Sequence, residues 1–225
     1  MKGILTMYRL NSLRSLISLT VVAGTLLLMG AGACQAQTLF TVSLDTSSLI
    51  GNANGPFSLD FQLNDGSGTN DGNNTAKLSN FNFGSGTATG AATNSGGASG
   101  DLASVVAIKD TSFGNELYQS FTPGNTLKFN VSLTGNTDAG LTPDEFSFAI
   151  LNSSFVEIPT TGAANAFLIA DINPQGITIQ TFAGAQPYAG IGAPTVSSTV
   201  PEPGLLAMLG AGLVPGLLLL RSRKR

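Results

Sequence analysis

Residues 57–63 read FSLDFQL, and every second residue of this stretch is apolar. The apolar positions are Phe57, Leu59, Phe61 and Leu63, and the polar positions between them are Ser58, Asp60 and Gln62. Successive side chains of a β-strand point to opposite faces, so a period of two predicts a strand with one buried face. The same alternation recurs over residues 127–133 and 146–150, which predicts two further strands of the same kind.

Six other segments have the composition of short strands and are separated by turn-forming residues. They are Leu39–Asp45, Ala76–Phe83, Ala103–Lys109, Glu116–Phe121, Ala166–Ile172 and Gly176–Phe182. About nine short strands with Gly- and Pro-rich turns predict an all-β domain over residues 37–183, namely an antiparallel β-sandwich of jelly-roll type. A closed barrel is the alternative.

Two segments predict irregular structure. Gly84–Gly100 contains no apolar residue larger than alanine, and we therefore expect a long mobile loop. Residues 184–199 are rich in Ala, Gly, Pro and Ser, which predicts a flexible linker after the β domain.

Composition excludes several classes of function. The chain has no His and no Trp, and its one Cys is Cys34, so His-based triads, thiol proteases and His or Cys zinc sites lack their parts. Residues 37–200 carry three lysines and twelve acidic residues. We expect no nucleic-acid partner, because such a surface repels phosphate backbones.

The N-terminus has the pattern of a secretory signal peptide. Lys2, Arg9 and Arg14 precede an apolar run over residues 16–29, and small residues follow up to Ala36. This order predicts a signal helix within residues 1–36 and cleavage by signal peptidase after Ala36. The alternatives are an uncleaved anchor, or a lipid attached to Cys34.

The C-terminus contains a second apolar run, over residues 205–220, which is followed directly by a basic tail. A helix of this length covers about 24 Å, close to the roughly 30 Å of a bilayer core. We expect a transmembrane helix here, with the tail on the cytoplasmic side. The tail residues are Arg221, Arg223, Lys224 and Arg225.

Pro201, Glu202 and Pro203 precede this apolar run, and proline keeps such a segment extended. "VPEPG", the apolar helix and the basic tail together resemble the PEP-CTERM sorting signal of Gram-negative, exopolysaccharide-producing bacteria. The resemblance covers about residues 199–225, and Pro215 within the apolar run departs from a regular helix. A plain tail anchor is the alternative.

The resemblance implies that residues 200–225 are a sorting signal read by the membrane enzyme exosortase. The protein would be anchored transiently in the inner membrane and then reach the cell envelope or the extracellular matrix of a biofilm. Exopolysaccharide would be its partner there. The body, over roughly residues 39–183, resembles more loosely a group of small exported PEP-CTERM proteins.

One polar loop contains oxygen ligands at regular spacing. Asp65, Ser67, Thr69 and Asp71 alternate as in a calcium-binding loop, and calcium prefers six to eight oxygens. However, Ala76 occupies the position where a bidentate glutamate would fall. An ordinary polar hairpin loop is therefore the alternative to a calcium site.

Two other patterns are candidate catalytic or binding sites. Asp144, Glu145 and Glu157 could supply a glycosidase carboxylate pair, although Asp144 and Glu145 fit better as the start of a strand. Tyr118, Tyr188 and the phenylalanines could form a platform that stacks on sugars, whereas alternating phenylalanines usually face a core. The sequence favours a non-enzymatic exported protein, and the alternative is a β-sandwich module that binds carbohydrate or calcium.

Overall fold

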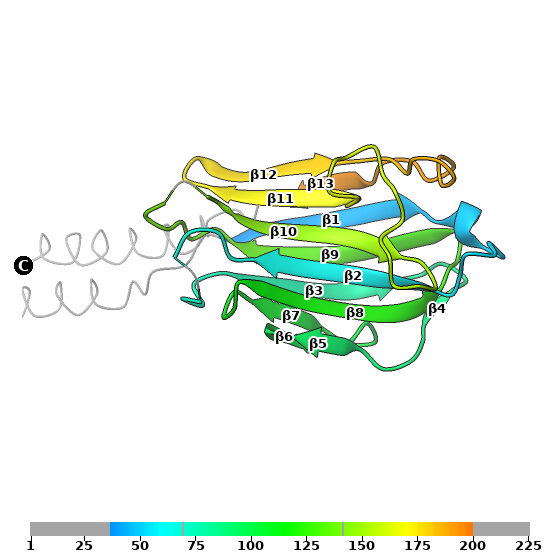
Figure 1. Ribbon diagram of the computed structural model, residues 1–225, viewed down its shortest axis with the longest axis horizontal. Helices are drawn as coiled ribbons and strands as arrows, with labels where there is room; N and C mark the ends of the chain where they lie inside the picture. Colours follow the sequence, from blue (N-terminus) through cyan, green and yellow to red (C-terminus); the bar gives the residue numbers. More distant parts are fainter. Residues whose placement is uncertain (1–36, 69, 141, 200–225) are drawn as a thin grey trace, which may run out of the picture. The chain divides into compact units, whose positions relative to one another are not determined.

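The computed structural model describes residues 37–68, 70–140 and 142–199, and these residues form β-strands and one short 3-10 helix, η1 (Ser47–Leu49) (Figure 1). All pairings between these strands are antiparallel. Within the described ranges, no helix is long and apolar enough to cross a bilayer. The predicted signal helix and the predicted C-terminal helix both lie outside the described residues.

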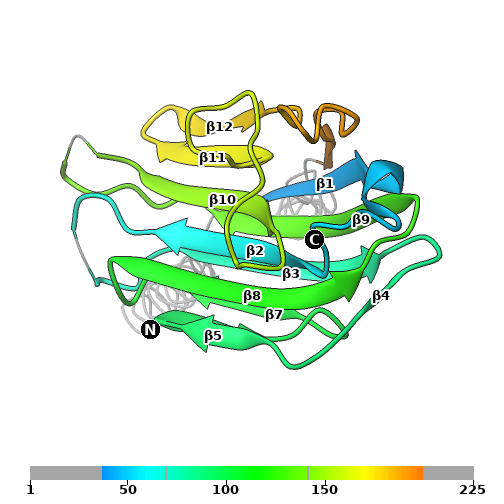
Figure 2. The same cartoon turned by 45° about the vertical axis from the view of Figure 1, so that its right-hand side comes forward.

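The strands form two sheets (Figure 1). The first has the order β13 (Thr195–Thr199), β1 (Gln37–Asp45), β9 (Thr126–Thr134), β3 (Thr75–Asn82), β7 (Val106–Lys109), β6 (Gly97–Gly100). The second has the order β12 (Gly176–Thr181), β11 (Leu168–Asn173), β10 (Asp144–Leu151), β2 (Phe57–Asn64), β8 (Gly114–Thr122), β4 (Thr87–Ala88), and β5 (Thr93–Ser95) also pairs with β8. Figure 2 shows the second sheet with β12 at the top and β5 at the bottom.

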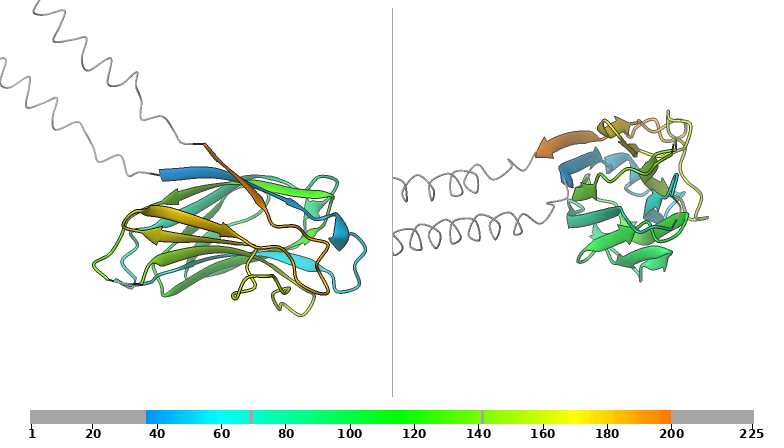
Figure 3. Two further views of the ribbon diagram at one scale, coloured as in Figure 1. Left: turned by 90° about the horizontal axis from the view of Figure 1, so that it is seen from above. Right: turned by 90° about the vertical axis from the view of Figure 1, so that its left-hand side faces the viewer.

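The two sheets are layers that share one hydrophobic core (Figure 3). Phe61 of β2 and Phe148 of β10 stack with ring centroids 5.3 Å apart. Phe129 of β9, in the other sheet, meets Phe61 edge-on at 5.3 Å and Phe148 at 5.2 Å. The alternating apolar residues thus face inward, as the period of two predicts.

The prediction of an all-β, antiparallel fold is confirmed, because each of the nine predicted segments contains a strand. One detail differs in β2, where the polar residues Ser58 and Asp60 are buried as well. β2 lies in the middle of its sheet, and Leu151, Phe155, Val156 and Glu157 line a groove on its outer face together with Asp60. The outer face of this strand is therefore partly covered.

The expectation of a mobile loop over Gly84–Gly100 is wrong, because β4, β5 and β6 lie in this segment and pair with β7 and β8. These pairings use backbone groups and need no apolar side chain. Glycine permits the close approach: a Cβ atom on Gly97 would lie 2.0 Å from the carbonyl oxygen of Lys109.

The expectation of a flexible linker over residues 184–199 is also wrong for its last part, since β13 pairs with β1 over five residues. β1 would otherwise be an edge strand with unpaired backbone groups, and β13 satisfies them. The start of the segment is ordered too, because the Gly184 N–H donates to the carbonyl of Ile191 at 2.8 Å.

Candidate functional site

The end of β2 and the start of β10 bring two aspartates together. β2 and β10 pair with Glu145 opposite Asn64, so Asp65, directly after β2, lies beside Asp144, the first residue of β10. The backbone N–H of Gly66 donates to Asp144 Oδ1 at 2.9 Å. The register of two paired strands therefore places these carboxylates.

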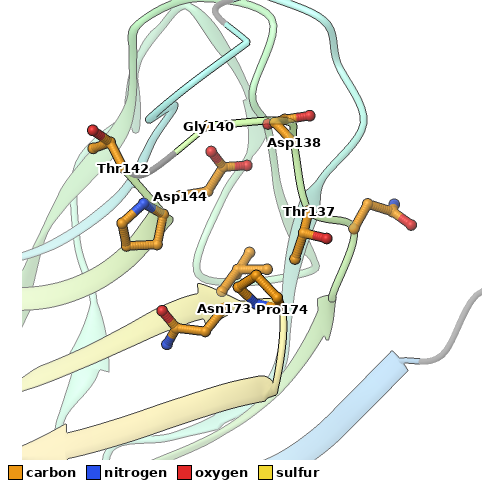
Figure 4. Close-up of a pocket in the computed structure, with 10 residues that line it drawn as sticks. Thr137, Asp138, Gly140, Thr142, Asp144, Asn173 and Pro174 are labelled. Atoms are coloured by element: carbon orange, nitrogen blue, oxygen red, sulfur yellow. The ribbon is translucent and has the colours of Figure 1, made fainter.

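A third carboxylate, Asp138, comes from the loop between β9 and β10. One oxygen each of Asp65, Asp138 and Asp144 lies within 4.8 Å of the other two. We call these three residues the acidic cluster. Asp65 is 1% exposed and Asp144 is 4% exposed, whereas Asp138 is half-buried. Figure 4 shows Asp138 and Asp144 at the side of a small pocket near Gly140.

Neutral groups donate hydrogen bonds to all three carboxylates. Asn74 Nδ2 donates to Asp144 Oδ2 at 2.7 Å, and Asn73 Nδ2 donates to Asp138 Oδ1 at 2.6 Å. The backbone N–H of Asn70 donates to Asp65 Oδ2. These amides orient the carboxylates but bring no positive charge to offset them.

The remaining oxygen of Asp65 has no partner in the described part of the chain. Asp65 Oδ1 is fully buried and makes no hydrogen bond to any described residue, and the same is true of Asn73 Oδ1 close by. A buried acceptor without a partner costs about 1–3 kcal/mol, and more when it is charged. The site therefore has unused capacity to accept a proton donor or a cation.

The electrostatics of the acidic cluster reflect crowded negative charge. Burial raises the pKa of Asp65, and the nearby carboxylates of Asp144 and Asp71 raise it further. Burial also raises the pKa of Asp138, with added contributions from Asp71 and Asp144. The neighbouring carboxylates thus disfavour the ionised forms of Asp65 and Asp138.

Asn74 is the hub that joins the surrounding loops. Its Nδ2 also donates to the carbonyl of Asn136 at 2.8 Å, and its Oδ1 accepts from Thr134 Oγ1 at 3.0 Å and from the Asn136 N–H at 2.9 Å. Its own N–H donates to Asp110 Oδ2 at 2.8 Å. One fully buried side chain thus holds the β9–β10 loop against the loop that follows β2.

Of the four predicted calcium ligands, the structure places only Asp65 in the acidic cluster. Ser67 Oγ instead accepts from the Thr142 N–H at 3.1 Å, and Asp71 accepts from the backbone and side chain of Asn73. Thr69 lies outside the described residues. Sequence reasoning missed Asp138 and did not assign Asp144 to calcium, because the cluster is formed by segments far apart in the sequence.

A second site lies on the outer face of β2 and β8. A groove of about 400 Å³ is lined by Asp60, Gln62, Glu116, Tyr118, Phe155 and Glu157, among others. We call it the β2–β8 groove. The Phe155 side chain is 61% exposed, and its ring centroid lies 5.5 Å from that of Tyr118. The groove thus combines an exposed phenylalanine and a half-buried tyrosine with three carboxyl groups.

Asp60 forms the buried floor of the β2–β8 groove. Burial raises its pKa to about 7, and the neighbouring Glu116 and Glu157 also raise it. Its Oδ2 accepts from Gln62 Nε2 at 2.8 Å, whereas its buried Oδ1 accepts no hydrogen bond from any residue that the structure describes. The Asp60 carboxyl group therefore keeps its proton to a higher pH than an ordinary aspartate does.

The residues that the sequence suggests for a carboxylate pair or a sugar platform do not lie together in the structure. Glu157 lines the β2–β8 groove, whereas Asp144 belongs to the acidic cluster, so they do not form one carboxylate pair. Glu145 lies opposite Asp171 in the pairing of β10 with β11. Tyr188 is buried and packs edge-on against Phe57 at 6.3 Å, so it belongs to the core and not to a sugar platform.

Comparison of the chain with protein-family models, with curated protein sequences and with solved structures gives no match.

Proposed function

We propose that the chain is a non-enzymatic exported protein, sorted by exosortase to the cell envelope or the extracellular polysaccharide matrix. The order of features at the C-terminus carries this proposal: Pro201, Glu202 and Pro203 precede the apolar run of residues 205–220, and the basic tail follows. The signal-peptide pattern of residues 1–36 supports export. In this proposal the apolar run holds the protein in the inner membrane until exosortase acts.

The displayed domain would be a β-sandwich of jelly-roll type. β1, β2 and β3 alternate between the two sheets, and β7, β8, β9 and β10 alternate in the same way. Such alternation across a shared core supports a double-sheet jelly roll. The acidic body, with only three lysines between residues 37 and 200, favours solubility over adhesion to anionic polymers.

The sorting proposal is tested by intact-mass analysis of the protein recovered from its native cells. Wild-type protein is expected to lack both residues 1–36 and part or all of residues 200–225. The double variant Pro201→Ala with Glu202→Ala is expected to keep the C-terminal tail and to remain in the membrane fraction. The control is Ser197→Ala with Ser198→Ala, at exposed positions just before the motif, which should be processed normally. Normal processing of the Pro201/Glu202 variant would refute the role of the motif.

The β2–β8 groove favours a second candidate function, the binding of a carbohydrate chain. Sugar rings stack on exposed aromatic faces, and Phe155 is exposed beside the half-buried Tyr118. Sugar hydroxyls donate to carboxylates such as Glu116 and Glu157. The carboxylates would repel uronic-acid polymers, so the groove fits neutral or amino sugars better.

Affinity electrophoresis in gels that contain exopolysaccharide purified from the native cells tests this candidate. The polymer is expected to retard the wild-type protein, and Phe155→Ala is expected to abolish the retardation. Phe113→Ala removes an exposed phenylalanine outside the groove and serves as the matched control. Equal migration of wild type with and without the polymer would exclude this function for that polysaccharide.

A further inference from the structure

We propose that Asp65, Asp138 and Asp144 bind one Ca²⁺ ion. The inference is independent of the sorting proposal and of the β2–β8 groove. It assigns a site built from three segments of the chain, in place of the single loop that the spacing of residues 65–71 suggests.

The separation of the oxygens fits one shared ion. Calcium–oxygen distances are about 2.3–2.6 Å, so two oxygens bound to the same ion lie at most about 5 Å apart. One oxygen from each of the three aspartates lies within 4.8 Å of the others. With small movements of the carboxylates, a single ion between them can therefore contact all three.

A second observation points to a cation independently of the cluster itself. The Asp65 side chain is buried, and its Oδ1 has no hydrogen-bond partner among the described residues, although four nearby amide groups donate to other acceptors. Leaving a charged oxygen in this state is costly unless an ion satisfies it. Asn73 Oδ1 is also buried and unpartnered, while its amide group donates to Asp138. This oxygen is a candidate for a fourth ligand.

The surrounding hydrogen bonds fix the carboxylates in place. Gly66 N–H and Asn74 Nδ2 hold the two oxygens of Asp144, and Asn73 Nδ2 holds Asp138. Such outer partners orient metal ligands and raise metal affinity. The backbone of Gly68 also lies close to the Asp138 side chain, because a Cβ atom on Gly68 would lie 2.8 Å from Asp138 Cγ. The site is thus organised before the ion arrives.

The chemistry of the ligands selects a hard cation. All three are carboxylates, and the chain has no His and only Cys34, so soft metals find no suitable ligands. A cavity of about 40 Å³, lined in part by Asp138 and Asp144, adjoins the cluster and has room for one water. Calcium tolerates an irregular set of protein and water oxygens, whereas magnesium demands a near-ideal octahedron.

The ion would join three parts of the chain. Asp65 follows β2, Asp138 lies in the β9–β10 loop, and Asp144 begins β10. Calcium would therefore tie the loop after β2 to the β9–β10 loop at one end of the sheets. Its binding energy would add to the stability of the folded domain.

The test uses the full chain, purified in detergent, stripped with EGTA and then titrated with CaCl₂ in a calorimeter. We expect one ion per chain with a dissociation constant of about 10⁻³ M or tighter. At a calcium concentration about a hundred times the dissociation constant, Tm should rise by about 5 °C. Asp138→Asn, at the half-buried position, should weaken binding at least tenfold, and Asp65→Asn should abolish it. Asp101→Asn, at a half-buried position outside the acidic cluster, is the matched control and should bind as wild type does.

Each result decides the proposal. Absence of heat and of a Tm shift at millimolar CaCl₂ in wild type would overturn it. Wild-type affinity in a folded Asp138→Asn variant would place the ion elsewhere and would also overturn it. If Asp65→Asn fails to fold by circular dichroism, the Asp138→Asn titration alone decides. Equal affinity for MgCl₂ would overturn the assignment of calcium.

Discussion

Asp60 of β2 lies directly opposite Tyr118 of β8, so a buried carboxyl group sits beside the aromatic pair of the β2–β8 groove. Glu116, also on β8, and Glu157, in the segment after β10, are the other ionisable groups that act on it. Burial and these two carboxylates raise the pKa of Asp60 to about 7. The folded protein therefore favours the protonated form of Asp60.

This raised pKa predicts a protein that loses stability as the pH rises. The unfolded chain releases the Asp60 proton near pH 3.8, whereas the folded protein keeps it until about pH 7. Between these values the native state binds more protons, so the free energy of unfolding should fall by about 1.4 kcal/mol per pH unit. Asp60→Asn should remove this part of the slope, and urea unfolding of both proteins at pH 5, 6, 7 and 8 measures it. Parallel slopes for the two proteins would contradict the assignment.

Removal of the Asn74 side chain should destabilise the folded domain. Asn74→Ala leaves the Asn136 N–H and Asp144 Oδ2 without their buried partner, which should lower the free energy of unfolding by about 3 kcal/mol. Asn94→Ala, at an exposed position of β5, should change it by less than about 0.5 kcal/mol. Urea denaturation followed by circular dichroism compares the free energies of unfolding of the two variants. Equal losses of stability would contradict the role of Asn74 as the hub.

The aromatic core gives a prediction about packing. Phe148 contacts Phe61 in its own sheet and Phe129 in the other sheet. Phe148→Ala should therefore lower the free energy of unfolding by about 3–5 kcal/mol. Phe113 is 70% exposed, and Phe113→Ala should have an effect within about 0.5 kcal/mol of zero. Thermal unfolding of the two variants measures the difference. Similar Tm values would mean that the core does not depend on this ring.

The ordered glycine-rich segment gives a further prediction. Gly97→Ala should destabilise the pairing of β6 with β7, by about 1–3 kcal/mol, since the new methyl group would lie 2.0 Å from the Lys109 carbonyl oxygen. Gly192→Ala places the same group in open space and should be nearly neutral. Amide hydrogen exchange of β6 and β7, recorded for both variants, would reveal the loss. Unchanged protection in Gly97→Ala would contradict the close approach.

The alternation of residues 57–63 was sufficient to predict a strand there, because burial of one face imposes a period of two on the side chains. The same alternation located two further strands, and strand-like composition between turn residues located six more. β4, β5, β6 and β13 left no such signal, since they pair through their backbones and carry small or polar side chains. Composition alone made them resemble a loop and a linker.

The acidic cluster could be predicted only in part. Asp65 stood out because it lies in a polar loop with regularly spaced oxygens. Its neighbour Asp144 is set by the register of β2 with β10, and register is a property of pairing that no single segment encodes. Asp138 depends in turn on how the β9–β10 loop folds over Asn73. A site made by three segments was therefore beyond local spacing rules.

The antiparallel pairing of β1 with β13 has a mechanical consequence. Leu39 lies opposite Thr199, so the folded domain begins and ends at neighbouring backbone positions. A pulling force applied between residues 37 and 199 would break the hydrogen bonds of this strand pair one after another. β13 would therefore separate from β1 at low force. The rest of the first sheet would bear load only after that strand had been lost.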